Sequence, residues 1–171
     1  MAENQDQASG GETQGQEGGF PLTVVTQYLK DMSFENPNGA EILTSLKEVP
    51  TGTIRVDVRV DPKTPPDVEV TLFLSVEAKT GDKVVYMVET EYAGIFRIGR
   101  VSQDVVLPLI MIEAPRLLFP FARNLVALAI QSGGFPPLFI NPIDFAALYR
   151  DKREQLMGQQ QGEGDGNQTV N

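Results

Sequence analysis

The stretch from residue 113 to residue 149 places the strongest constraint on how this chain can fold. It holds five of the nine phenylalanines, together with a long apolar helix pattern and an apolar loop rich in proline. So much aromatic surface must either pack against the rest of the protein or bind something apolar. The segments ahead of it have the composition of β-strands. We therefore expect a sheet on which this stretch packs.

Four segments before residue 93 have strand patterns. The clearest is 53–61, where isoleucine and valine at even positions alternate with arginine and aspartate at odd positions. Short turns separate the segments, and short connections favour antiparallel neighbours. In the first strand, Asp31, Ser33 and Glu35 are expected on one side and Lys30, Met32 and Phe34 on the other. The expected strands are residues 22–35, 53–61, 68–79 and 83–92.

The connections between these strands are expected to be irregular. Residues 36–39 read Asn-Pro-Asn-Gly, which is typical of a turn. Residues 40–51 have no clear pattern. Residues 93–98 are expected to leave the sheet, with Gly94 allowing a bulge or a sharp bend.

Apolar residues recur at helical spacing after the sheet, which predicts a helix over residues 102–131 that ends at Gly133 and Gly134. Three prolines within it each remove a backbone hydrogen bond, so the helix is expected to be kinked or interrupted and continuous at least over 117–130. The prolines are Pro108, Pro115 and Pro120.

A second helix is expected over residues 142–156, with Asn141 as its N-cap and Pro142 at its first position. The fold class is then α+β, with a four-stranded antiparallel sheet packed with two C-terminal helices. The first helix is apolar nearly all round, which one small sheet cannot cover, so oligomerisation through this helix is expected. The residues expected at the oligomer interface are Leu107, Met111, Leu118, Leu125 and Leu128.

Charge and composition narrow the classes of partner. The net charge is −9, and residues 20–157 carry 17 acids against 14 bases. Nucleic acid is a poor partner for such a chain, because phosphate binding needs a basic face. Residues 1–19 and 158–171 are polar and expected to be disordered tails that flank one domain, 20–157. Proline and arginine interrupt the 105–130 region, and the start lacks a signal-peptide pattern, so a soluble cytoplasmic protein without membrane insertion is expected.

The chain contains no cysteine and no histidine. It therefore lacks disulfides, the usual thiol nucleophile, the commonest general base and the usual ligands of structural zinc. Glycine-rich nucleotide motifs and the Gly-x-Ser-x-Gly motif are also missing. We expect no enzyme activity, no cofactor and no metal.

Two surfaces remain as candidates for function. The first is aromatic and would form a groove that binds unfolded, extended chains, although the same residues could form an ordinary core. The second is acidic and would suit a basic partner, although it could be only a solvated sheet face. The acidic candidates are Asp31, Glu35 and Glu89, with Glu77 as a further one. The groove candidates are Phe73, Tyr86, Phe119, Phe121, Phe135, Leu138 and Phe139.

Several motifs together resemble the SecB family of protein-export chaperones. The first is Tyr-Leu-Lys-Asp-Met-Ser-Phe-Glu-Asn-Pro-Asn at residues 28–38. Gly-Ile-Phe follows at 94–96, Leu-Leu-Phe-Pro-Phe-Ala-Arg at 117–123, and Gly-Phe-Pro-Pro-Leu at 134–138. Pro-Ile-Asp-Phe-Ala-Ala-Leu-Tyr stands at 142–149. The resemblance spans about residues 20–149 in order and spacing.

This resemblance implies a homotetramer built as a dimer of dimers, with the long helix at the interface between dimers. It also implies an ATP-independent chaperone (a holdase) that binds unfolded secretory precursors and passes them to the SecA motor. SecA's contacting tail is basic and carries zinc, so that metal belongs to the partner. By the same resemblance, Tyr86 and Phe121 match client-groove positions best. The positions that match SecA-contacting residues are Asp31, Glu35, Met87 and Glu89.

Two other interpretations stay open. One is a SecB-like chaperone dedicated to an antitoxin, against which the intact acidic set argues. The other is a structural oligomer that binds no client and whose aromatic residues are all core.

Overall fold

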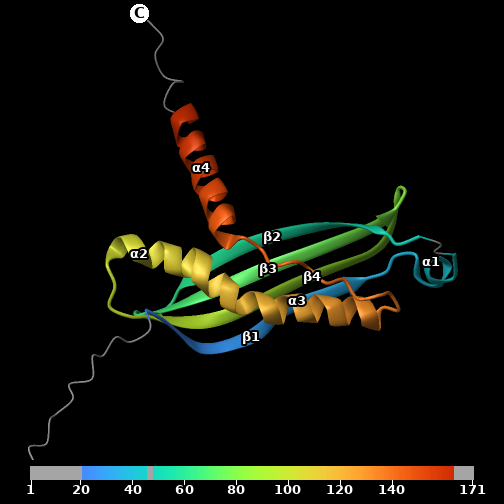
Figure 1. The fold of residues 1–171 in the computed structure, drawn as a ribbon, viewed down its shortest axis with the longest axis horizontal. Helices are drawn as coiled ribbons and strands as arrows, with labels where there is room; N and C mark the ends of the chain where they lie inside the picture. Colours follow the sequence, from blue (N-terminus) through green and yellow to red (C-terminus); the bar gives the residue numbers. More distant parts are fainter. Residues whose placement is uncertain (1–20, 46–47, 164–171) are drawn as a thin grey trace, which may run out of the picture.

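The computed structural model describes residues 21–45 and 48–163 of the chain. Four antiparallel strands form one sheet in the order β1-β4-β3-β2, and a long helix crosses one of its faces (Figure 1). The expected α+β fold with a four-stranded antiparallel sheet is confirmed. The strands are β1 (Leu22–Glu35), β2 (Thr51–Pro62), β3 (Asp67–Thr80) and β4 (Lys83–Ile98).

The sheet order follows from the lengths of the connections. Short turns join β2 to β3 and β3 to β4, so these three strands form a meander of antiparallel neighbours. β1 then pairs with the free side of β4, which leaves β1 and β2 as the two edges. Alternation in β3 directs one set of side chains into the core, where they are fully buried. This set is Val70, Leu72, Leu74 and Val76.

The connections contain more regular structure than the sequence pattern predicts. Residues 40–51 were expected to be irregular, but α1 (Gly39–Ser45) forms there and buries Ile42. Residues 93–98 were expected to leave the sheet, but β4 continues to Ile98, because β1 and β3 both pair with it up to that end. Gly94 lies inside β4, where it is paired with Gln27 of β1 and Val70 of β3.

Gly94 serves close packing rather than a bulge. The register shifts of the β1–β4 pair lie in β1, between Val24 and Thr26 and between Leu29 and Asp31. A Cβ atom at Gly94 would lie only 2.8 Å from the Phe96 ring and 3.1 Å from Leu118 of the crossing helix. The missing side chain therefore lets the helix approach β4.

The long helix is interrupted, as expected. It consists of α2 (Gln103–Pro108), a π-helical turn η1 (Leu109–Glu113) and α3 (Ala114–Ser132). Pro115 cannot donate a hydrogen bond back to the preceding turn, and the wider turn η1 directly precedes it. Pro120 lies inside α3 without ending it.

The helical segment Gln103–Ser132 passes a length and hydropathy test for a membrane span, with a mean hydropathy of 1.7 in its most apolar window. Proline and arginine within it therefore do not exclude a span on composition alone. In the structure 39% of that window is buried, and α3 packs against β3 and β4. The core helix of a soluble protein passes the same test.

The last helix, α4 (Phe145–Glu163), begins three residues later than expected. Asp144 and not Asn141 caps it, because the Asp144 Oδ1 atom accepts hydrogen bonds from the backbone N–H groups of Ala146 and Ala147, both at 3.0 Å. These bonds lower the pKa of the Asp144 carboxyl. Residues 158–163, expected in a disordered tail, belong to this helix. The rest of that tail (164–171) and the tail 1–19 lie outside the described residues.

Candidate functional site

The two faces of the sheet carry different chemistry. The inner face packs against α3 and is apolar, whereas the outer face carries rows of polar and charged side chains. Each row crosses the strands in the order β1, β4, β3, β2, as the registers show. The row through Ser33 continues to Glu89, Ser75 and Arg55.

The four residues that match SecA-contacting positions all lie on this outer face. Glu35 is paired with Met87 in the sheet register, and Glu89 lies in the neighbouring row. Asp31 lies one row further along, opposite Glu91. We call Asp31, Glu35, Met87 and Glu89 the acidic face.

A depression of about 260 Å³ overlaps the acidic face. Glu35, Met87 and Glu89 line it, while Asp31 lies outside it. The depression also includes residues that the sequence pattern did not assign to a site, although their odd positions in the strands give the same face. These are Ser33, Thr53, Arg55 and Ser75, together with Glu77, which was named as a further acidic candidate.

The carboxylates of the acidic face are available to an outside cation. Asp31, Glu35 and Glu89 are exposed and form no ion pair with any residue that the structure describes. Glu89 accepts one long hydrogen bond, from the Ser75 hydroxyl at 3.4 Å. Glu77 differs, because Lys79 pairs with it at 3.0 Å. Unpaired carboxylates attract basic groups over several ångströms.

A bulge in β1 moves Lys30 away from its expected side. The register skips Lys30 between Leu29 and Asp31, so its side chain reaches the outer face instead of joining Met32 and Phe34 on the inner one. A bulge adds one residue to one strand and so reverses the alternation beyond it. Asp31, Ser33 and Glu35 keep the shared side that was predicted.

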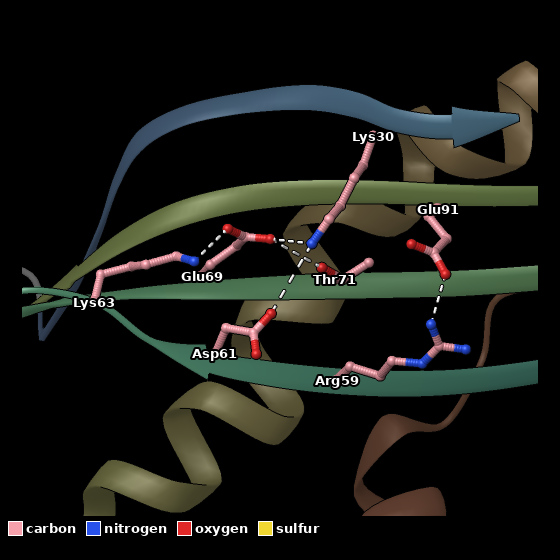
Figure 2. A network of polar contacts seen from close by, with 7 residues as sticks. All are labelled: Lys30, Arg59, Asp61, Lys63, Glu69, Thr71 and Glu91. Carbon is pink, nitrogen blue, oxygen red and sulfur yellow. Dashed lines mark hydrogen bonds and ion pairs between the residues drawn. The ribbon is translucent and has the colours of Figure 1, made fainter.

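Lys30 belongs to a polar network around Glu69 on β3 (Figure 2). The Lys30 ammonium donates to Glu69 Oε1 at 2.5 Å, and Lys63 pairs with Oε2 at 2.9 Å. The Thr71 hydroxyl lies 3.5 Å from the same carboxylate. The hydrogen bonds from Lys30 and Lys63 outweigh the effect of burial and lower the pKa of Glu69 to about 2. This half of the outer face is therefore internally neutralised and offers little charge to a partner.

Part of the predicted aromatic groove forms on the opposite side of the molecule. Tyr86, Phe135 and Leu138 line a pocket of about 280 Å³, and the rings of Tyr86 and Phe135 lie 5.0 Å apart. Burial raises the pKa of the Tyr86 hydroxyl. Sequence reasoning missed the opposite wall, which is formed by Val49 and Pro50 from the segment that had no clear pattern.

The other groove candidates lie elsewhere. Phe73 is on the outer face beneath Arg59, so it does not share a groove with Tyr86. Phe119 is buried and packs edge-on against Phe145, which makes it core. Phe121 is half exposed on α3 and stacks on Tyr92.

Phe139 is 79% exposed and lines a second pocket, of about 310 Å³. This pocket lies between α3 and the loop before α4. Its other lining residues are Pro120, Arg123, Asn124, Ala127 and Ile140.

The predicted interface residues of the long helix fall into three groups by exposure. Leu107 and Leu128 are about half exposed and available to another subunit. Met111 and Leu125 are partly buried. Leu118 is fully buried against the sheet, so its assignment to an oligomer interface is wrong. The helical period alone cannot tell which side of an all-apolar helix faces the sheet.

No three Asp, Glu, His or Cys side chains come together as metal ligands within residues 21–45 and 48–163.

Comparison with protein families and solved structures gives a consistent result. The family model described as "Preprotein translocase subunit SecB" matches residues 15–156. Protein-export protein SecB of Afipia carboxidovorans is 47% identical over 140 residues, which cover 82% of this chain and 87% of the relative. Protein-export protein SecB of Sinorhizobium medicae is 46% identical over 147 residues, which cover 86% and 88%.

A solved structure supports the fold. A SecB-like chaperone of Mycobacterium tuberculosis, in complex with a peptide from an antitoxin, matches with a TM-score of 0.59. The match covers 72% of this chain and 91% of that one, at 12% sequence identity. At that identity the likeness concerns the fold alone.

Proposed function

This chain belongs to the SecB family, and on that premise we propose that it is a cytoplasmic, ATP-independent chaperone that delivers unfolded precursor proteins to the SecA motor. Members of this family are protein-export chaperones and not enzymes. The proposal assigns two surfaces of the molecule to two partners. The apolar pockets hold the precursor, and the acidic face binds SecA.

The pocket lined by Tyr86 carries the client-binding part of the proposal. Its apolar walls come from the proline-rich loop and from the segment before β2, and both are irregular. Prolines leave such backbone extended and unpaired, and Leu138 stays partly exposed while Phe135 is buried in the core. A partly open apolar surface of this kind suits an extended chain with little sequence preference. The exposed ring of Phe139 adds a second apolar contact.

Client binding is tested by the aggregation of a chemically unfolded precursor, followed by light scattering. The native chain should keep the precursor in solution. Leu138→Ser should weaken this effect, because it places a hydroxyl in the apolar wall of the pocket. Thr44→Ser on the exposed α1 helix is the matched control. Equal protection by all three proteins would contradict the pocket assignment.

The SecA part of the proposal is supported by the unpaired carboxylates of the acidic face. Asp31→Asn combined with Glu89→Gln should weaken SecA binding by about tenfold at low ionic strength, because two exposed charges are removed. Asp104→Asn combined with Glu154→Gln removes the same net charge from exposed helical positions elsewhere. Calorimetric titration with SecA measures both. Normal binding by the first variant would exclude the acidic face as the contact.

A homotetramer assembled as a dimer of dimers is also part of this proposal. Two surfaces support it, the exposed apolar residues of the long helix and the edge strand β1, where Val25, Tyr28 and Leu29 are exposed. An apolar edge strand left uncovered favours pairing with another chain. Light scattering after size exclusion gives the subunit number directly.

The antitoxin-dedicated chaperone remains the alternative outcome of the same experiments. It would keep the fold and the client pocket but would not bind SecA. A chain that protects precursors yet shows no heat of binding with SecA would favour it.

A further inference from the structure

Arg59 on β2 covers two groups that would otherwise extend the acidic face. Its Nη1 atom donates to Glu91 Oε1 at 2.5 Å, and its guanidinium carbon lies 5.2 Å from the centre of the Phe73 ring. Figure 2 shows the side chain extending from β2 to Glu91 on β4. Glu91 and Phe73 occupy the row of Asp31, directly beside Glu89. The covered pair is therefore continuous with the acidic face.

A second carboxylate is within reach of Arg59. Asp57 Oδ2 lies 3.7 Å from Arg59 Nε, while Asp57 Oδ1 accepts a hydrogen bond from Lys152 of α4 at 2.8 Å. Asp57 stands two positions before Arg59 on the same strand and the same face. Arg59 can thus leave Glu91 and keep an anionic partner.

The contacts that hold Arg59 in place are weak. Its side chain is 52% exposed, and water and salt screen an ion pair at such a position. The guanidinium lies over the half-buried Phe73 ring, and such a contact is weak when the cation itself remains in water. A guanidinium from another protein would make the same two contacts, so replacing Arg59 on Glu91 and Phe73 changes the free energy little. The partner's other basic residues would still be attracted by the carboxylates of Asp31 and Glu89.

We propose that Arg59 is a displaceable internal cation, and that an arginine of a bound basic segment takes its place on Glu91 and Phe73. This rests on the proposed function, in which a basic segment of SecA binds the acidic face. The occupant is an arginine because a planar guanidinium both stacks on the ring and donates to the carboxylate, whereas an ammonium is a compact point charge. The contact surface then includes Glu91 and Phe73 in addition to the acidic face.

Removing the internal cation should improve binding of the partner. In Arg59→Gln the Glu91 carboxylate is free, so the affinity for SecA should rise about two- to fivefold. Arg97→Gln is the matched control, because Arg97 lies at the far end of the same face and pairs with Asp67 at 2.7 Å. It makes the same change in net charge but does not free Glu91, so the affinity of Arg97→Gln for SecA should change less. Adding Glu91→Gln to Arg59→Gln should abolish the gain.

Two synthetic peptides of equal length and charge test the chemistry of the partner, one carrying arginine and the other lysine as its only basic residue. The gain in Arg59→Gln should be larger for the arginine peptide, and an equal gain would overturn the guanidinium exchange. If the native protein binds SecA but Arg59→Gln and Arg97→Gln bind it with equal affinity, displacement of Arg59 is wrong. The assignment of the acidic face to SecA is then unaffected. If native protein does not bind SecA, the proposed function and this inference both fall.

Discussion

Glu69 is a carboxylate that is buried on the outer, polar face of the sheet. It is 5% exposed, yet it stays ionised because two lysines donate to its carboxylate. The lysines themselves are partly exposed, so the network buries one charge and leaves its partners in contact with water. Alternation along β3 puts Glu69 on the outer face but gives no indication of its partners, because Lys30 reaches it only through the β1 bulge.

Acid should destabilise the fold through Glu69. Its pKa is about 2 in the folded protein against 4.5 for an ordinary glutamate, so its contribution is complete above pH 4.5 and is lost as the pH falls toward 2. Glu69→Gln should cost about 1–3 kcal/mol at pH 7 and flatten the dependence of stability on pH in that window. Urea unfolding at several pH values measures this. Glu113→Gln, which breaks an exposed pair with Arg116, should cost much less.

Gly133 is a second residue whose role is decided by its neighbours. The sequence pattern assigns it to the end of the helix, but its φ of −73° is ordinary, and Gly134 takes the left-handed conformation at +89°. A Cβ atom at Gly133 would meet the Phe34 ring at 2.1 Å. Its missing side chain makes room for that ring.

Gly133→Ala should therefore destabilise the fold by about 1–3 kcal/mol, because the Phe34 ring must move. Phe34→Leu in the same chain should recover part of the loss. Gly52→Ala, where nothing lies within 4 Å of the added atom, serves as the control and should change the urea midpoint little. Equal midpoints for Gly133→Ala and Gly52→Ala would show that the ring moves freely.

At the scale of elements, the Lys152 side chain joins α4 to the edge of the sheet. Lys152 donates to Asp57 Oδ1 at 2.8 Å and lies 3.3 Å from the backbone carbonyl of Val58 on β2. At the start of the helix, Phe145 is buried in the core. Figure 1 shows α4 projecting away from the sheet. The helix is thus held by the buried Phe145 in its first turn and, two turns later, by the hydrogen bonds of Lys152 to β2.

Lys152→Met should remove the hydrogen bonds that hold this part of α4 to β2. Backbone amides of residues 149–155 should exchange hydrogen faster, while those of α3 should not change, because the buried Phe145 keeps the first turn in place. Lys83→Met, which breaks the exposed pair with Glu41, is the control. Hydrogen exchange followed by mass spectrometry would contradict this role of Lys152 if the rates in α4 were equal in the two variants.

At the scale of the whole molecule, the apolar surface left uncovered is the main argument for assembly. Leu117, Phe121 and Leu128 lie on the exposed side of α3, at spacings that place them on one stripe. A single chain gains nothing from exposing them, whereas burial in an interface stabilises by about 25 cal/mol per Å².

Leu128→Glu should weaken the assembly without unfolding the chain, because Leu128 is about half exposed within one subunit. Light scattering should show a lower mass for Leu128→Glu than for the native protein. Leu118→Ala is the contrasting variant. It should lower stability by about 2–5 kcal/mol and leave the subunit number unchanged, because Leu118 is buried against the sheet. A native mass for Leu128→Glu would remove this stripe from the interface.

Local patterns were sufficient for the fold class, the sheet and the face that carries Asp31, Glu35, Met87 and Glu89. Alternation is a property of each strand alone, and short turns limit which strands can pair. The approximate bounds of β1, β2 and β3 and the interruption of the long helix likewise follow from local signals, since proline acts within one turn. The end of β4 does not, because pairing with β1 and β3 extends it to Ile98.

Other features depended on contacts between distant segments. Nothing in the sequence marks the β1 bulge that directs Lys30 to Glu69 or the wall that Val49 adds to the Tyr86 pocket. The same holds for the burial of Leu118 and for the placement of Phe73 beneath Arg59. Side chains of one type are equivalent in a periodic pattern, and only the packing of α3, β2 and β4 decides which are buried, which are paired and which remain free. The sequence by itself therefore determined the architecture and the acidic face, whereas the tertiary structure decided which aromatic residues share a pocket and which charges are left for a partner.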